Sequence, residues 1–237
     1  MANTWFKFKQ FTIFHDKTAM KVGTDSVLLG AWAGVEGKEK ILDIGTGTGI
    51  IAIMLAQRSL AKIEGIEIEE EAFNQAVENA KKSPWSDRIT MFRQSFQDFS
   101  EQNGPAYDGI VSNPPFFDNS LPPSNNPRVL AKHTSELNRS DLLHGVTRLL
   151  KPRGTFSVIL PYTTESEFID TARGYNLFVS RKMNIRPTAE KDYHRIMIEF
   201  STEQGITTEE FLTIEKGERH DYTDEYKDLT KDFYLKF

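Results

Sequence analysis

The chain has 237 residues, and its 29 Lys and Arg against 34 Asp and Glu give a formal net charge of −5. This length predicts one large domain, 1–237, and 38% hydrophobic residues with 17 Phe argue against a globally disordered chain. The lack of Cys excludes a disulfide framework, a Cys-ligated zinc and a thiol nucleophile, and no apolar run approaches the roughly 20 residues of a membrane helix. The first ten residues also lack the apolar core of a secretory signal. We therefore expect a soluble, cytoplasmic protein.

The middle of the chain alternates strand-like and helix-like stretches, which is typical of βαβ units around a mainly parallel sheet. Strands are expected at 40–44, 62–68, 89–93, 107–111 and 155–160, and helices at 50–58, 69–82 and 140–150. The stretches 177–184 and 194–201 predict a terminal β pair. The apolar spacing of Tyr226, Leu229 and Phe233 predicts a tail helix within 223–237 that packs on the sheet. The segments 1–36 and 202–237 thus flank a core of 37–201.

A glycine-rich turn, Asp43-Ile-Gly45-Thr-Gly47-Thr-Gly49, joins the first strand of this core to its helix. Glycines there permit positive φ and close approach of a ligand, toward which the helix amides point. The G-x-G-x-G spacing disfavours a dinucleotide-binding dehydrogenase, and Asp43 suits a ligand with a positive end. S-adenosylmethionine (SAM), with its ammonium and sulfonium, fits that charge. The alternative is a turn that merely connects two elements.

Two further observations on the sequence bear on the identity of the cofactor. Glu67 lies at the end of the second strand, where a carboxylate is placed to accept both hydroxyls of a ribose. The stretch from Asp43 to Gly49 also resembles motif I of the class I SAM-dependent methyltransferases. This motif indicates the cofactor and leaves the substrate open.

A second motif, Asn113-Pro114-Pro115-Phe116, follows the fourth strand. The prolines stiffen the loop and hold Asn113 extended, so that its side chain can point into the cleft. Asn113 Oδ1 and the Pro114 carbonyl could both accept hydrogen bonds from one exocyclic NH₂ group, while Phe116 offers a face on which a planar base can stack. This arrangement suits methylation of a weakly basic nitrogen by positioning and electrostatics. The alternative is a proline-capped strand exit with a core Phe.

This loop resembles motif IV of the amino-nitrogen methyltransferases, usually (D/N/S)PP(Y/F/W). That class includes adenine-N6 enzymes, rRNA guanine-N2 enzymes and enzymes that modify a protein glutamine amide, and the motif does not choose among them. The glutamine enzymes carry a separate helical domain before motif I, for which about 40 residues leave little room. A SAM-binding module without catalysis is the alternative from another class.

The opening segment narrows the choice among these classes of amino-nitrogen methyltransferase. Phe8-Lys-Gln-Phe11, His15-Asp16, 19–25 and 28–32 resemble the bacterial tRNA1(Val) (adenine-N6)-methyltransferases, and the likeness continues through 42–49, Gln75, Glu78-Asn79, 83–85, 113–116 and the tail. It therefore covers nearly the whole chain. The resemblance implies a Rossmann-like α/β fold, with a mainly parallel seven-stranded sheet and an antiparallel terminal strand. It also implies SAM-dependent methylation of N6 of adenine 37, beside the tRNA anticodon.

The family's functional residues map onto positions of this sequence. The resemblance implies contacts with SAM from Lys21, Gly23, Thr24, Asp43, Gly45, Gly47 and Glu67, and catalysis by Asn113, Pro114, Pro115 and Phe116. The family often has an Asp after the third strand near the cofactor adenine, where this chain has Ser95, with Asp98 three residues later. Motif IV commonly ends in Tyr, and Phe116 keeps the stacking face without the hydroxyl.

The substrate contacts are predicted from charge. Residues 127–153 hold six Lys and Arg against two acids, and Arg128 and Lys132 follow the catalytic loop. We expect these two residues to contact tRNA phosphates; a solvated loop is the alternative. The five His show no close spacing of metal ligands, so no metal is expected. We expect a monomer.

Overall fold

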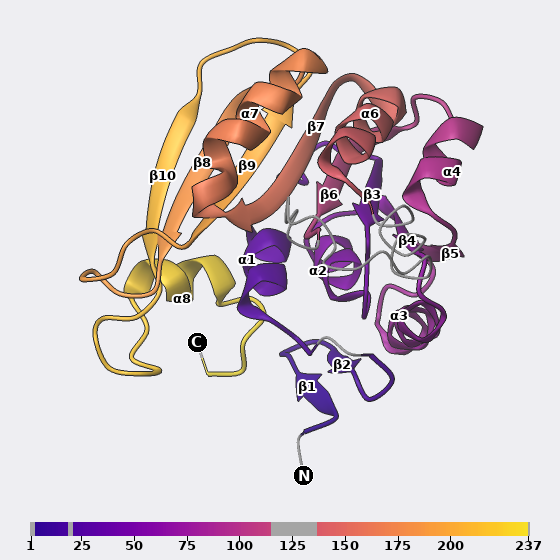
Figure 1. Ribbon diagram of the computed structural model, residues 1–237. Coiled ribbons are helices and arrows are strands. Elements are labelled where there is room, and N and C mark those ends of the chain that lie inside the picture. Colours follow the sequence, from indigo (N-terminus) through magenta and orange to yellow (C-terminus); the bar gives the residue numbers. More distant parts are fainter. Residues whose placement is uncertain (1–2, 19–20, 115–136, 237) are drawn as a thin grey trace, which may run out of the picture.

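The computed structural model describes residues 3–18, 21–114 and 137–236. An eight-stranded sheet forms the centre, in the order β10-β8-β9-β7-β6-β3-β4-β5, and a two-stranded hairpin, β1-β2, lies beside it (Figure 1). The strands are β1 Trp5–Lys7, β2 Thr12–Phe14, β3 Lys40–Ile44, β4 Lys62–Glu67, β5 Ile89–Arg93, β6 Tyr107–Ser112, β7 Leu150–Pro161, β8 Phe178–Arg186, β9 Arg195–Ser201 and β10 Thr208–Thr213. The α-helices are α1 Thr24–Trp32, α2 Ile50–Arg58, α3 Glu70–Lys82, α4 Phe96–Gln102, α6 Arg139–Leu149, α7 Glu165–Gly174 and α8 Asp224–Thr230.

The predicted α/β class is confirmed, and five of the strands run parallel from β5 to β7. In their register Ile44 lies opposite Ile66 of β4 and Ser112 of β6. The carboxyl ends of β3, β4 and β6 therefore meet at one edge of the sheet, where open α/β sheets bind ligands. This edge receives the glycine turn, Glu67 and Asn113.

The predicted terminal β pair is also confirmed. Strand β9 is antiparallel to both β7 and β8. The described sheet has eight strands rather than the expected seven, because β10 adds to β8 in parallel at the edge. Its sequence, TEEFLT, is mostly polar, and only Leu212 is buried, as an edge strand with one solvated face allows. Polar composition concealed this strand from a search for apolar runs.

The core divides into two clusters, one on each face of the sheet. Alternate residues of single strands belong to opposite clusters, as Val111 and Ile110 do in β6 and Met197 and Ile198 do in β9. Helices α1 and α2 cover the first face, and α4, α6 and α7 cover the second (Figure 1). Helix α2 is buried from Ile50 to Ala56, which explains why its sequence is apolar on every side.

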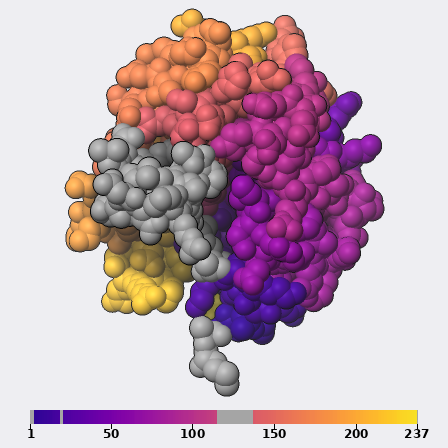
Figure 2. All heavy atoms as spheres, turned by 45° about the vertical axis from the view of Figure 1, so that its right-hand side comes forward, coloured from indigo at the N-terminus to yellow at the C-terminus, as the bar shows by residue number. Residues whose placement is uncertain are grey.

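The two ends of the described chain meet on one side of the molecule. The Lys9 amide donates to the Phe233 carbonyl at 2.8 Å, and the rings of Phe8 and Tyr234 stack with their centroids 5.8 Å apart. Figure 2 shows the indigo N-terminal and yellow C-terminal segments together at the lower end. The expected tail helix forms as α8, and it packs against α1 and the edge strand β10. None of the helices in the described part of the chain is both long and apolar enough to span a bilayer.

The N-terminal hairpin is fastened to α3 by the polar residues 75–79. Asn79 accepts from the Phe14 amide and donates to the Phe14 carbonyl, both at 2.9 Å, and it also donates to the Thr48 carbonyl in the glycine turn at 2.9 Å. Gln75 accepts from the Lys17 amide at 3.2 Å. These contacts bring the opening segment to the carboxyl edge of the sheet.

Candidate active site at the carboxyl edge of the sheet

The glycine turn adopts the conformation that its sequence predicts. Gly45 and Gly47 have φ of 67° and 56°, a left-handed region that other residues rarely adopt. A Cβ placed on Gly45 would meet nothing within 4 Å, so the turn has open space on that side. The turn is held to β4 by the Thr46 amide, which donates to the Ile66 carbonyl at 3.0 Å. It therefore offers a rigid backbone wall to a ligand.

Asp43 lies fully buried beneath this turn. Its Oδ2 accepts from Thr46 Oγ1 at 2.5 Å and from the Ala52 amide at 3.2 Å. Its Oδ1 is buried and has no hydrogen-bond partner among the described residues. Burial raises the pKa of Asp43 to about 7, against the opposing effect of the two hydrogen bonds. A cation placed at the turn would offset this unpaired negative charge, so the site favours a positive ligand group.

Glu67 follows β4 and is held by backbone amides. Oε2 accepts from the Gly47 amide at 2.9 Å, and Oε1 accepts from the amides of Ile68 and Glu69 at 2.9 and 3.0 Å. These bonds occupy three of about four lone-pair directions of a carboxylate. One lone-pair direction of Glu67 is therefore left for a ribose hydroxyl. The second hydroxyl of the diol would take the direction that the Gly47 amide occupies.

Asn113 directly follows β6 at the same edge, and it is half-buried ahead of a buried Pro114. Its Nδ2 donates to Ser26 Oγ, on the first turn of α1, at 3.1 Å. This bond fixes the amide so that Oδ1 is the atom left to accept from a substrate. Sequence analysis missed Ser26, because nothing in the local pattern relates two residues 87 positions apart. Pro115, Phe116, Arg128 and Lys132 lie outside the described residues.

The start of α1 brings the N-terminal candidates to this edge. Gly23 is the N-cap residue and makes no side-chain cap, and Thr24 is the first residue of the helix. Lys21, Gly23 and Thr24 are exposed. Asp25, in the first turn, forms an ion pair with Arg195 of β9 at 2.8 Å, which ties the start of the helix to the sheet.

Ser95 and Asp98, the two candidates after β5, form one hydrogen-bonded unit. Ser95 is the N-cap of α4 and accepts from the Asp98 amide at 3.1 Å, while its hydroxyl donates to Asp98 Oδ2 at 2.7 Å. A ligand that approaches one of these side chains therefore meets both. Over residues 3–18, 21–114 and 137–236, no three His, Asp or Glu side chains gather in a way that could hold a metal ion.

Comparison with known proteins agrees with this geometry. A family model described as a methyltransferase domain matches residues 36–212. The solved structure of a predicted O-methyltransferase from Agrobacterium tumefaciens superposes with a TM-score of 0.67 at 18% identity, over 88% of this chain and 96% of that one. The fold and the glycine turn thus define a methyltransferase domain of the Rossmann-like class.

Two curated relatives specify the family. A tRNA1(Val) (adenine(37)-N6)-methyltransferase of Bacteroides thetaiotaomicron is 47% identical, over 99% of both chains. A second protein of that name, from Parabacteroides distasonis, is 46% identical over the full length of both chains. This chain belongs to the tRNA1(Val) (adenine(37)-N6)-methyltransferase family.

Proposed function

We propose that this enzyme transfers the methyl group of SAM to N6 of adenine 37 in the anticodon loop of valine tRNA. The observation that carries the proposal is the placement of Asn113 beside the glycine turn, with its amide oriented by Ser26, in a chain 47% identical over its length to an enzyme of that name. We also propose that it acts as a cytoplasmic monomer of one domain, 1–237, as the sequence predicts.

The residues at the turn fit SAM. The buried, unpaired Oδ1 of Asp43 favours a positive end, and the open side of Gly45 leaves room for it. Gly45 and Gly47 would hold the amino-acid part of the cofactor and Glu67 its ribose. We assign the remaining contacts to Lys21, Gly23, Thr24 and Ser95, of which the last would meet the adenine. When bound, SAM supplies an electrophilic methyl group.

The catalytic loop acts on the substrate nitrogen by orienting it. The lone pair of an adenine amino group is delocalised into the ring and is nearly non-basic. We propose that Asn113 Oδ1 accepts one N6 hydrogen and the Pro114 carbonyl the other, which turns the lone pair out of the ring plane. The same two acceptors stabilise the positive charge that develops on nitrogen. The nitrogen then loses a proton without a dedicated base, because its cationic form is strongly acidic.

The rest of the loop would position the substrate. Phe116 would stack on the target base, and Arg128 and Lys132 would contact phosphates. Adenine 37 must leave its stack to reach the cleft, which costs less in a loop than in a duplex. Pro115 would keep the loop rigid while this happens.

Methyl transfer from labelled SAM to total unmodified tRNA, followed by nucleoside mass spectrometry, tests the proposal. We expect N6-methyladenosine at position 37 of valine tRNA. Parallel reactions with unmodified rRNA and with a release factor test the two alternative substrates. Transfer to guanine N2 or to a glutamine amide, with none to tRNA, would retain the fold and cofactor and overturn the substrate.

A further inference from the structure

A cavity of about 750 Å³ lies beside the first turn of α1. Its walls come from β1, the start of α1, the loops after β8 and β10, and the tail. Its described lining includes Gly23 and Thr24 but not Asp43, Gly45, Glu67 or Asn113, so it adjoins the site described above at the start of α1 without including the glycine turn or the Asn113 side chain. The volume is within the range of small-molecule pockets, roughly 300–1,000 Å³.

Aromatic side chains form much of this cavity. Tyr222 and Tyr226 stack with centroids 5.0 Å apart, and Tyr234 lies 6.3 Å from Tyr226 and 6.0 Å from Phe6. These contacts build a continuous wall of rings. Trp5 lines the same cavity from β1 and keeps 43% of its surface exposed, which is unusual for so large an apolar side chain. Trp5 therefore offers an indole face to an incoming planar group.

The cavity is also locally cationic on an acidic chain. Lys7, Arg186, Arg195 and Lys236 carry four positive charges, against two from Asp25 and Glu215, so the lining has 4 − 2 = +2. The rest of the chain then carries −5 − 2 = −7. Positive charge beside stacked and exposed rings is the chemistry that recognises single-stranded nucleic acid.

The cavity and the catalytic loop share the first turn of α1. Thr24 and Leu28 line the cavity and are four residues apart, so they lie on one face of the helix. Ser26, which holds Asn113, is two residues from Thr24 and therefore points roughly 200° away around the axis. The cavity and Asn113 thus lie on roughly opposite sides of the first turn of α1. An unstacked loop can reach both.

We propose that this cavity binds the base of a nucleotide adjacent to the target, 36 or 38, stacked on Trp5 with its phosphates among Lys7, Arg186 and Lys236. The proposal rests on the proposed function, because it takes the same RNA as its ligand. Anchoring a neighbouring base here would hold adenine 37 out of its stack beside Asn113.

The test combines protein and RNA changes in one cycle. The enzyme is assayed with an unmodified valine anticodon stem-loop and with two copies that are abasic at 36 or at 38. The protein variants are Trp5→Ala, Trp5→Phe and the control Leu60→Ala, an exposed residue in the loop between α2 and β4. For Trp5→Ala we expect the KM for RNA to rise between about fivefold and 100-fold, as loss of one base stack implies. Its kcat and SAM affinity stay within twofold, and Trp5→Phe and Leu60→Ala resemble the wild type.

The proposal is decided by whether the effects of Trp5→Ala and of an abasic site on the KM for RNA depend on each other. One abasic RNA should raise the KM of the wild type about as much as Trp5→Ala does, and should add nothing further in that variant. Independent effects of Trp5→Ala and of both abasic sites would overturn the cavity as a base site. If Trp5→Ala lowers the melting temperature, the double variant Lys7→Ala/Lys236→Ala serves instead. This double variant should reduce the steepness of log K for RNA binding against log salt concentration by about 2. An unchanged slope would overturn the proposal.

The wild-type arm separates this proposal from the proposed function. N6-methyladenosine in the intact stem-loop reports the function alone, whatever the variants do. If the wild type leaves the RNA unmethylated, the proposed function fails. Fluorescence anisotropy then measures the binding of the same three RNAs to the same protein variants. This comparison tests the cavity without methyl transfer.

Discussion

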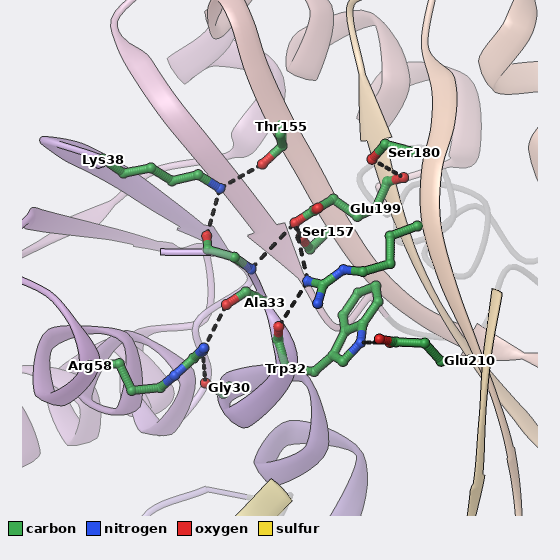
Figure 3. Close-up of polar contacts among 12 residues, drawn as sticks. Gly30, Trp32, Ala33, Lys38, Arg58, Thr155, Ser157, Ser180, Glu199 and Glu210 are labelled. Carbon is green, nitrogen blue, oxygen red and sulfur yellow. Dashed lines mark hydrogen bonds and ion pairs between the residues drawn. The ribbon is translucent and has the colours of Figure 1, made fainter. Parts of the chain in front are cut away.

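Helix α1 has a polar cluster at each end, and the two clusters differ in how completely their groups are paired. At the C-terminal end, Arg58 donates to the carbonyls of Gly30 and Ala33 at 2.9 and 2.7 Å, and Arg181 donates to the Trp32 carbonyl at 3.0 Å (Figure 3). The last carbonyls of a helix have no partner within it, and cations there also interact favourably with the helix dipole.

The same cluster continues into the sheet. Lys38 donates to the Gly34 carbonyl and to Thr155 Oγ1, both at 2.6 Å, while Glu199 accepts from the Gly34 amide at 3.3 Å and from Ser157 Oγ at 3.1 Å. Burial lowers the pKa of Lys38, and the nearby Glu199 opposes that shift. The charged groups of this cluster thus find partners within the chain, which is what a structural network requires.

The N-terminal end of α1 is different. There Ser26 holds Asn113 by one hydrogen bond, and at the same edge of the sheet Asp43, beneath the glycine turn, keeps a buried oxygen with no partner among the described residues. Buried polar groups are normally paired, so the unpaired oxygen beneath the open glycine turn is a place where a ligand can complete the arrangement. The comparison teaches that the number of charges does not identify the active site. An unpaired atom does so only together with an open turn, because buried atoms of Gln57 and Asn184 also lack a partner among the described residues. Five predictions test this contrast, beginning with the largest expected effect on methyl transfer.

Asn113→Ala should lower kcat by at least about 100-fold, because it removes one of the two acceptors that stabilise charge on the target nitrogen. The Kd for SAM should change less than twofold, which isothermal titration measures. Asn103→Ala is the control, since that exposed side chain donates to the Phe99 carbonyl within α4. Equal losses of SAM affinity in Asn113→Ala and Asp43→Ala would contradict the separation of roles.

SAM affinity should depend on pH through Asp43. With its pKa raised to about 7 in the free enzyme, Asp43 is largely protonated at pH 6, and a bound cation should bring its pKa back toward about 4. Binding then releases a proton, so the Kd for SAM should be about tenfold higher at pH 6 than at pH 8. Asp43→Asn should bind SAM weakly with a flat profile. A flat profile in the wild type would contradict the assignment.

The same pKa has a consequence for stability, with the sign fixed by its direction. A carboxyl group whose pKa is higher in the folded than in the unfolded state favours folding at low pH. That contribution is lost as the pH rises from about 4 through 7. The SAM-free enzyme should therefore lose stability over this range relative to Asp43→Asn, which thermal unfolding at pH 5 and pH 8 would show.

Ser26→Ala should lower kcat between about threefold and tenfold with the KM for RNA unchanged, because loss of one neutral hydrogen bond frees the Asn113 amide. Ser26→Thr keeps the acceptor oxygen and should recover most of the rate. A purely structural role would instead lower the melting temperature of Ser26→Ala and leave kcat at saturating substrates intact. The ratio of kcat in the two variants is the measurement.

Arg58→Met should leave kcat at 25 °C unchanged while lowering the free energy of unfolding by about 2–3 kcal/mol, because two carbonyls of α1 lose their donor. Denaturant unfolding measures the loss. Arg173→Met, which removes an exposed guanidinium paired with Asp170 at 3.4 Å, should stay within about 0.5 kcal/mol. A large loss of kcat in Arg58→Met would show that the two ends of α1 are not separable.

The strongly patterned part of the fold could be predicted from the sequence. Strands β3 and β5 and helix α2 have the expected bounds, because continuous apolar runs end at clear turn residues. Helix α6 begins one residue earlier than expected, since Asn138 caps it by accepting from the Asp141 amide at 2.9 Å. Helices α4 and α7 were not predicted, because they are short or polar and pack through few apolar residues.

Strand β7 shows why local signals fail in a paired sheet. The sequence Lys-Pro-Arg-Gly at 151–154 reads as a turn, so the strand was expected to begin at Thr155. In the structure it begins at Leu150, which pairs with Tyr107, and Arg153 takes a positive φ of 66°. A register shift between Tyr107 and Gly109 absorbs the irregularity. Long-range pairing overrode the local turn preference.

The candidate site follows the same rule. The glycine turn and Asn113 are visible in the sequence because each is a compact motif. Ser26 and the aromatic cavity are not, since their partners are brought together only by the fold.

The contact between the two ends of the described chain also determines when the cavity proposed to bind RNA is complete. The cavity takes one wall from residues 3–7 and another from residues 222–236, and Lys9 is bonded to Phe233. Residues 5–7 pair with β2 locally, but their contacts with residues 222–236 are far apart in the sequence and therefore of the slow, non-local kind. A chain stopped before residue 222 could form its glycine turn and yet lack the wall that receives RNA. Loss of the C-terminal segment by truncation should thus produce a cofactor-binding protein that leaves RNA alone.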